Sequence, residues 1–163
     1  MNSTTHTETT EGVEPEPVVA FTRGVELLKN GYSKRAFDCL KRAVESDPRN
    51  PYYLSFCGLA LARAARKWGK AIDLCEQAIQ IKRREIQFHL NLADVYVAAG
   101  RRGDALDTID RALKSLGNDK RLRMARHRAE TRRALVIPFL TRENVLNREL
   151  GKLRHRILGP RTD

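Results

Sequence analysis

Apolar and small residues recur at helical spacing through the middle of the chain. In the stretch GYSKRAFDCLKRAVESDPRN, residues 31–50, Ala36, Leu40 and Ala43 stand four and three positions apart, with mostly polar residues between them. Residues three and four apart share one face of a helix, so this spacing predicts an amphipathic helix. Pro48 closes it, because proline cannot continue a helix.

The same frame occurs twice more, after 35 residues and then after 34. It consists of Ala71, Cys75 and Ala78, and then of Ala105, Ile109 and Ala112. A second set of residues precedes each frame at the same period: Gly24 with Leu27, Gly58 with Leu61, and Ala93 with Tyr96. Two sets with one period predict three pairs of helices, in which the small residues let neighbouring helices approach closely.

With these residues the chain resembles the tetratricopeptide repeat family, whose unit is a helix-turn-helix of about 34 residues. Pro48 matches the closing proline of the family pattern, which Arg83 and Gly117 replace in the later units. The resemblance implies an all-α fold, a right-handed superhelical α-solenoid of three helix-turn-helix repeats with a C-terminal capping helix and an amphipathic tail helix. The middle unit has one extra residue in ARAARKWGKA, from which we expect a distorted or longer inner turn.

The segments of the chain follow from this pattern. The three-repeat domain covers 17–118, in units of about 17–50, 51–84 and 85–118. Residues 1–16 have four Glu and no Lys or Arg, which predicts a disordered, acidic, Thr-rich arm. Residues 119–135 predict a basic capping helix with an apolar stripe of Leu122, Ala125 and Ala129, and 136–163 a Pro-interrupted amphipathic basic tail.

Composition narrows the class of protein. The apolar content of 41% favours a folded chain, and no stretch approaches the roughly 18 apolar residues of a membrane span. The first residues do not resemble a signal peptide, so we expect a cytoplasmic protein. The net charge is +11, and residues 119–163 hold 13 Lys and Arg against 5 Asp and Glu, which favours acidic partners. The tail is similar to the ends of some bacterial members of the family, which indicates a bacterial source.

The sequence gives no indication of catalysis. It has no Gly-rich phosphate loop, GxSxG or HExxH motif, so we expect no enzyme and no cofactor. Cys39, Cys57 and Cys75 form no CxxC pair and stand among apolar residues, which is typical of buried free thiols rather than metal ligands. His89 occupies the position of the family's opening Trp, and we expect a half-buried structural histidine there.

The resemblance implies that the first helix of each repeat lines a concave surface. The candidates for a peptide groove are Phe21, Thr22, Val25, Tyr52, Ser55, Phe56, Leu59, Gln87, Leu90, Asn91 and Asp94. These residues are mainly apolar and aromatic, which favours a partner segment with large apolar anchors over the family's clamp for a terminal carboxylate. Some of the aromatic residues are expected to pack between helices instead.

The main functional hypothesis is a protein-interaction scaffold or adaptor that binds a protein or peptide and carries out no chemistry. One alternative is binding of nucleic acid or an anionic surface through the basic-patch candidates, although the patch lacks the aromatic residues that stack bases. These candidates are Arg121, Arg123, Arg126, Arg128, Arg132 and Arg133. Another alternative is a holdase like the secretion chaperones of similar size. Those chaperones are usually acidic, whereas this chain is basic. The tail also allows self-association through residues 142–158, or docking on the chain's own groove.

Overall fold

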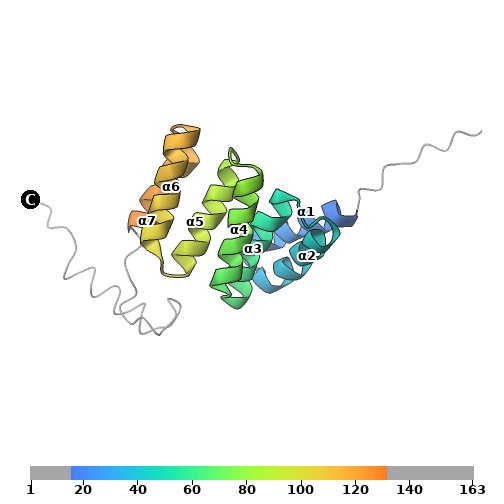
Figure 1. Cartoon of the computed structure of the whole chain (residues 1–163). Coiled ribbons are helices and arrows are strands. Elements are labelled where there is room, and N and C mark those ends of the chain that lie inside the picture. Colours follow the sequence, from blue (N-terminus) through green and yellow to red (C-terminus); the bar gives the residue numbers. More distant parts are fainter. Residues whose placement is uncertain (1–15, 132–163) are drawn as a thin grey trace, which may run out of the picture. The chain divides into compact units, whose positions relative to one another are not determined.

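The computed structural model describes residues 16–131, and this part of the chain consists of seven α-helices without a strand (Figure 1). The predicted all-α fold is confirmed for these residues. Several expectations lie outside the described residues: the arm before Glu16, the end of the capping segment with Arg132 and Arg133, and the tail at 136–163 with its self-association segment.

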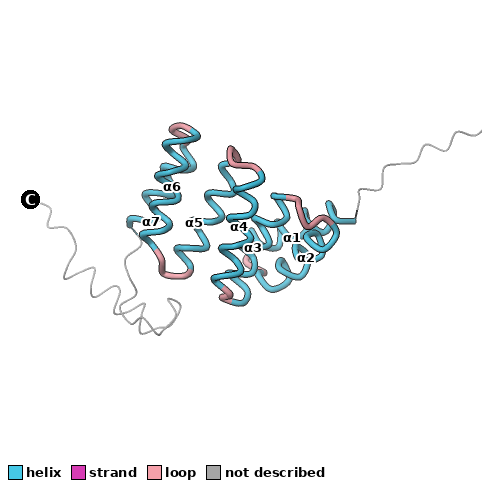
Figure 2. Tube along the Cα trace, in the orientation of Figure 1, coloured by secondary structure: helices cyan, strands magenta, loops and turns pink. Residues whose placement is uncertain are grey.

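The helices follow one another in pairs joined by short loops (Figure 2). Their bounds are α1 Glu16–Lys29, α2 Ser33–Ser46, α3 Pro51–Ala65, α4 Trp68–Ile81, α5 Ile86–Ala98, α6 Arg102–Leu116 and α7 Lys120–Thr131. The pairs α1 and α2, α3 and α4, and α5 and α6 correspond to the three expected units. The predicted boundary of the first unit is wrong by one residue, because Glu16, assigned to the disordered arm, is the first residue of α1. The end of the first unit at 50 and the units 51–84 and 85–118 remain our proposal for the repeats.

Side chains in the loops between pairs fix where the first helix of the next pair begins. The side chain of Asn50 accepts hydrogen bonds from the backbone amides of Tyr52 and Tyr53, and Pro51 occupies the first turn of α3. In the same way Glu85 accepts from the amide of Gln87 at the start of α5. Such caps satisfy amides that have no partner within the helix.

Within each pair the chain reverses through a residue with a left-handed backbone. Gly31 and Gly100 have φ of 84° and 80°, and Arg66 has the equivalent position in the middle pair with φ of 53°. Only Arg66 and Lys67 separate α3 from α4, whereas three residues separate the helices of the other two pairs. The expected longer turn is therefore wrong, because the extra residue of the middle unit is taken up by a longer α3.

The small residues of the repeat pattern mark the closest helix contacts. A Cβ atom added at Gly58 would meet the carbonyl oxygen of Ala71 at 2.7 Å and Sγ of Cys75 at 2.8 Å. At Gly24 it would meet Cγ of Leu40 at 2.6 Å. The absence of a side chain thus allows the two helices of the first and of the second pair to pack at short range, as the sequence pattern predicts.

The helices between Glu16 and Leu116 form an inner and an outer layer. In the inner layer α3 packs along α5, and α1 touches α3 at few positions. In the outer layer α2, α4 and α6 each pack on inner helices and not on one another. Because the inner helices are in contact and the outer ones are spread, the array curves toward the face of α1, α3 and α5.

One continuous apolar core runs from α1 to α7. It includes Leu28 in α1, Leu40 in α2 and Ile109 in α6. The predicted stripe of the capping segment lies in α7, where Leu122, Ala125 and Ala129 are buried in the same core. These three residues cover the end of the array, which would otherwise leave apolar surface open to water.

The three cysteines are free thiols, and the expected burial is confirmed for two of them. Cys57 and Cys75 are buried, and Cys39 is partly exposed. Burial raises the pKa of Cys57 to about 11 and that of Cys75 still further, so both are uncharged packing residues. None of the helices in the described part is long and apolar enough to cross a membrane.

Candidate functional site

All the residues predicted for the groove lie in α1, α3 and α5, and they differ in how far solvent can reach them. Thr22 and Asp94 are exposed. Those that are half-buried are Phe21, Val25, Tyr52, Phe56, Gln87 and Leu90. Ser55, Leu59 and Asn91 are buried, so they belong to the interior and not to a surface that a ligand can touch.

Aromatic packing fills the space between α1 and α3. The ring of Phe21 lies 5.1 Å from that of Tyr53 and 5.5 Å from that of Phe56, the second pair edge to face. Such contacts are favourable beyond their buried area. The three rings therefore join the first two repeats, and the expectation that some aromatic residues of the groove pack between helices is confirmed here.

A buried polar pair joins α3 to α5. The side-chain amide of Asn91 donates to Oγ of Ser55 at 2.9 Å, and Asn91 accepts from Nε2 of Gln87 at 2.8 Å. Both Ser55 and Asn91 are almost without solvent contact, so removal of either side chain would leave the Oγ of Ser55 or the Nδ2 of Asn91 without its partner. This is the reason why two polar residues predicted for the groove lie between the helices instead.

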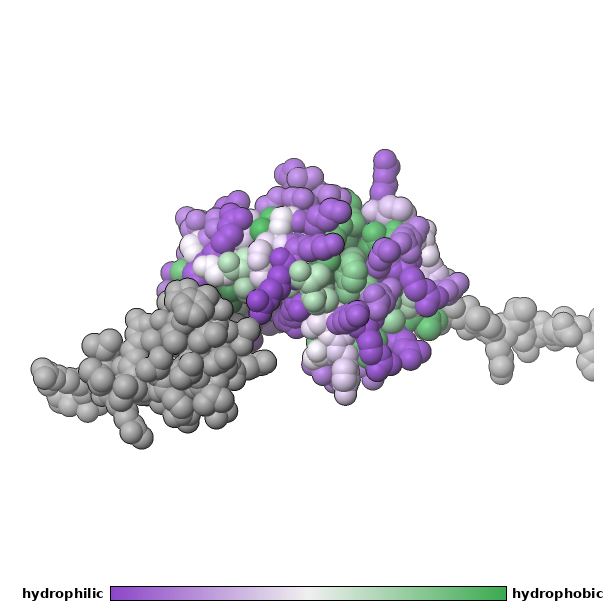
Figure 3. Space-filling view, turned by 90° about the horizontal axis from the view of Figure 1, so that it is seen from below, coloured by the Kyte–Doolittle hydropathy of each residue, from purple (hydrophilic) through white to green (hydrophobic). Residues whose placement is uncertain are grey.

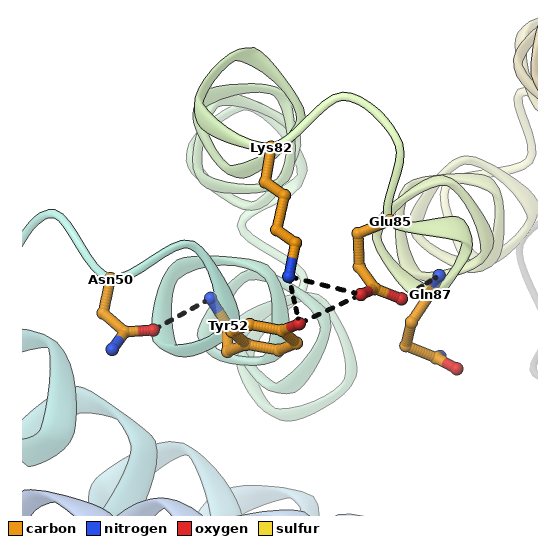
Figure 4. A network of polar contacts seen from close by, with 5 residues as sticks. All are labelled: Asn50, Tyr52, Lys82, Glu85 and Gln87. Carbon is orange, nitrogen blue, oxygen red and sulfur yellow. Dashed lines mark hydrogen bonds and ion pairs between the residues drawn. The ribbon is translucent and has the colours of Figure 1, made fainter.

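A polar network closes one end of the inner face (Figure 4). Nζ of Lys82 donates to the Tyr52 hydroxyl at 2.7 Å, and the hydroxyl donates to Oε2 of Glu85 at 3.0 Å. Lys82 and Glu85 are 3.8 Å apart, and the ring of Tyr52 packs edge to face on Phe88. The hydrogen bond to Tyr52 raises the pKa of Lys82. Tyr52 is thus held in one orientation by two residues of the loop between α4 and α5 and by one residue of α5.

An ion pair lies toward the opposite end of the same two inner helices. Nη2 of Arg63, in α3, is 3.4 Å from Oδ2 of Asp94, in α5. The side chains are 40% and 50% exposed, so the pair contributes little to stability, and both groups can still reach a ligand. Together with Lys82 and Glu85, this pair places opposite charges at the two ends of an otherwise apolar face.

Lys82, Glu85 and Arg63 are absent from the residues predicted for the groove. The first two follow the end of α4, outside the helices whose residues the sequence pattern assigned to the groove. Glu85 could have been found as a capping residue, since it stands directly before a helix. Nothing in the spacing indicates the contact of Lys82 with Tyr52, because 30 residues separate them.

The surface of the described helices has apolar patches within a charged surround. On the face shown in Figure 3, hydrophobic side chains gather in the middle of the described part and hydrophilic ones border them. An apolar patch with a polar border is typical of a surface that binds another protein.

The arginines of α7 do not form a continuous free patch. Nε of Arg126 is 2.7 Å from Oδ1 of Asp110 in α6, and Arg121 contacts Asp119 through its Nε at 3.4 Å. Arg123 and Arg128 are exposed on the same helix. Carboxylates close to Arg121 and Arg126 reduce the positive potential that a nucleic acid would meet there.

The described residues offer no obvious catalytic group. His89 is half-buried, with its Nε2 at 2.9 Å from the carbonyl oxygen of Arg83, which agrees with the expected structural histidine. No group of three or more His, Cys, Asp or Glu side chains in residues 16–131 is arranged to hold a metal ion.

Comparison with known proteins agrees with this architecture. The family model for the tetratricopeptide repeat matches residues 62–129. Tetratricopeptide repeat protein 17 of Danio rerio is 33% identical over 69 residues, which is 42% of this chain and 6% of that protein. The chain therefore spans only a small part of this relative.

Solved structures with the same fold are similar over most of their length. The first repeat domain of Spaghetti (RPAP3), solved with an HSP90 peptide, has a TM-score of 0.58 and 20% identity over 71% of this chain and 93% of that one. The Sgt2 domain of Aspergillus fumigatus has a TM-score of 0.60 and 16% identity over 92% of this chain and 88% of that one.

The helix pairs, their small-residue contacts, the sequence match and the shared fold all agree. Residues 62–129 match the family model of the tetratricopeptide repeat, and the described helices share the fold of solved tetratricopeptide repeat domains.

Proposed function

We propose that this chain is a protein-interaction scaffold that binds a segment of a partner protein along the inner face of α1, α3 and α5 and carries out no chemistry. One observation carries the proposal: half-buried apolar side chains, including Phe56 and Leu90, lie between two polar contacts on that face. Apolar anchor sites with polar groups beside them are the usual design of a peptide-binding surface.

The charges of the inner face favour a segment with apolar anchors. Arg63 already contacts Asp94, and Lys82 already contacts Glu85, so a terminal carboxylate would have to displace a carboxylate of the chain itself. The Spaghetti domain was solved with the HSP90 peptide SRMEEVD, and at 20% identity this likeness concerns the fold. For our chain we propose one or two large apolar side chains as the main anchors, with the two ion pairs at the ends of the bound segment.

Binding of nucleic acid through α7 receives less support. Arg121 and Arg126 both contact carboxylates, and base-stacking aromatic residues are absent from α7. The cytoplasmic location, the bacterial source and the self-association of residues 142–158 stay predictions from the sequence.

The test is a peptide selection followed by mutation of the inner face. Peptides selected from a random library against the full chain would be measured by fluorescence anisotropy on Leu90→Ser and Asp94→Arg variants. The control is Leu113→Ser, which changes a half-buried leucine on the outer helix α6. We expect the inner-face variants to weaken binding at least about tenfold, as truncation of an anchor does, and the control to change it little.

Two results would contradict the proposal. One is a set of selected peptides whose affinity does not depend on Leu90 or Asp94. The other is tight binding of a DNA duplex that falls steeply as salt increases, because that dependence marks the release of counterions from phosphates.

A further inference from the structure

A second concave surface lies on the outer side of the last two repeats. Here α4 and α6 both pack on α5 but not on each other, so a cleft of about 490 Å³ remains between them. Its size falls within the range of about 300 to 1,000 Å³ that is usual for ligand sites. The lining residues come from α4, α5, α6 and the loop between α4 and α5.

The floor of the cleft is apolar. Leu92 is buried there, and Ile79 and Leu116 are half-buried on either side. The polar groups beside them already have partners: the hydroxyl of Thr108 donates to the carbonyl oxygen of Asp104 at 2.7 Å, and that of Ser115 to the carbonyl oxygen of Arg111 at 2.9 Å. The floor therefore offers contacts to an apolar side chain and few free hydrogen-bonding groups.

The rim of the cleft is positively charged. Arg83, Arg84 and Arg111 line it, and none of the three forms a salt bridge with a carboxylate in the described part of the chain. The single acidic residue of the lining, Glu76, accepts a hydrogen bond from the Tyr96 hydroxyl at 3.3 Å. Three positive charges thus surround an apolar floor with one carboxylate to offset them.

We propose that this outer cleft binds an acidic segment of a partner protein. One large aliphatic or aromatic side chain of the segment fills the floor against Ile79, Leu92 and Leu116. Carboxylates on both sides of it pair with Arg83, Arg84 and Arg111, whose planar guanidinium groups fit carboxylates through two hydrogen bonds at once. A phosphate backbone would gain from the arginines but not from the apolar floor.

This site is independent of the inner face. The floor is formed by α4 and α6 together with the outward side of α5, whereas the inner face belongs to α1, α3 and the other side of α5. Two segments can therefore bind at once, and two segments of one partner would increase each other's effective concentration. Loss of binding at one site leaves the other intact, so the two proposals fail separately.

The probe is a capped peptide in which one leucine and one phenylalanine stand among glutamates, measured with the full chain by fluorescence anisotropy. We expect Arg84→Glu and Arg111→Glu to weaken binding at least about tenfold, as reversal of a charge at a specific contact does. The matched control is Arg49→Glu, because Arg49 is exposed in the loop of the preceding repeat that corresponds to the loop of Arg84. It changes the net charge equally and should leave the affinity within about twofold.

Two altered peptides and an NMR measurement complete the test. Replacing the glutamates by glutamine, or both apolar residues by serine, should abolish binding. Methyl signals of Ile79 and Leu116 should shift on binding, while those of Val25 and Leu90 on the inner face should not.

The proposal is overturned if the probe does not bind, if Arg49→Glu weakens binding as much as Arg84→Glu, or if the serine peptide binds equally well. It is also overturned if the unchanged chain does not bind the probe but a triple variant with Glu8→Gln, Glu11→Gln and Glu14→Gln does. That result would assign the cleft to the chain's own acidic segment.

Discussion

Single residues control how closely the helices of this array approach one another. Gly58 is the clearest case, since α3 leaves no space for a side chain between itself and α4. Arg66 shows the opposite situation, because a residue with a full side chain occupies a left-handed position that the other two turns give to glycine. Each position leads to a measurable prediction.

Gly58→Ala should destabilise the protein by about 2 kcal/mol, because the added methyl group overlaps the Ala71 carbonyl and the Cys75 sulfur. Gly103→Ala is the matched control. Gly103 lies in α6 with nothing within 4 Å of an added Cβ, so alanine should stabilise by about 0.5 kcal/mol through its helix propensity. Urea unfolding followed by circular dichroism measures both changes, and equal effects of the two substitutions would contradict the close contact.

Arg66→Gly should stabilise the protein by about 0.5 kcal/mol. The left-handed conformation costs a residue with a Cβ about 1 to 2 kcal/mol, and the greater freedom of glycine in the unfolded chain offsets part of the gain. Gly100→Ala, at the equivalent turn of the third pair, should instead destabilise. Thermal unfolding of both variants should give a higher melting temperature for Arg66→Gly and a lower one for Gly100→Ala. A lower melting temperature for Arg66→Gly would show that the arginine side chain makes a stabilising contact.

At the scale of helices, the contact between α3 and α5 differs from that between α1 and α3. Aromatic rings separate α1 from α3, whereas two small polar residues, Ser55 and Asn91, let α3 and α5 pack closely. This difference determines which side chains of the inner face stay accessible. It also explains why the sequence pattern, which treats the three repeats as equal, placed buried residues in the groove.

Asn91→Ala should destabilise the protein by about 2 to 3 kcal/mol, since it removes buried atoms and leaves the Ser55 hydroxyl without its partner. Ser55→Ala should cost less, about 1 kcal/mol. A double-mutant cycle measured by urea unfolding should give a coupling of about 1 kcal/mol between the two residues. A coupling near zero would mean that the hydrogen bond does not hold the helices together.

At the scale of the molecule, one core joins the helix pairs to α7. Leu122 in α7 belongs to the same cluster as Leu28 in α1 and Leu40 in α2, through contacts that continue from pair to pair. In a repeat array each pair is stabilised mainly by its neighbours. A weak end therefore affects the remaining pairs.

Leu122→Ala should destabilise the array by about 3 kcal/mol, because it opens a cavity at a fully buried position. The fluorescence of Trp68, the single tryptophan, reports on α4, and circular dichroism reports on all helices. Both should show the same lower midpoint if α7 unfolds together with the repeats. Exposed Met124→Ala in the same helix is the control, and a midpoint of Trp68 that does not change would show that α7 unfolds alone.

The sequence by itself determined the repeat and most of the core. The frames at Ala36, Ala71 and Ala105 and the stripe of α7 are buried as their spacing predicts. These features are local, since they depend on residues three and four apart on one helix, and such periodicity can be read directly from the chain.

Only the tertiary structure decided which surfaces a partner can reach. The burial of Asn91, the contact of Lys82 with Tyr52 and the cleft above Leu92 all join residues from different helices. They depend on how far apart neighbouring helices lie, which follows from the size of every side chain at each interface. The position of a residue in the repeat determines which face of its helix it lies on. The distance to the next helix decides whether a partner can reach that face or whether it is buried.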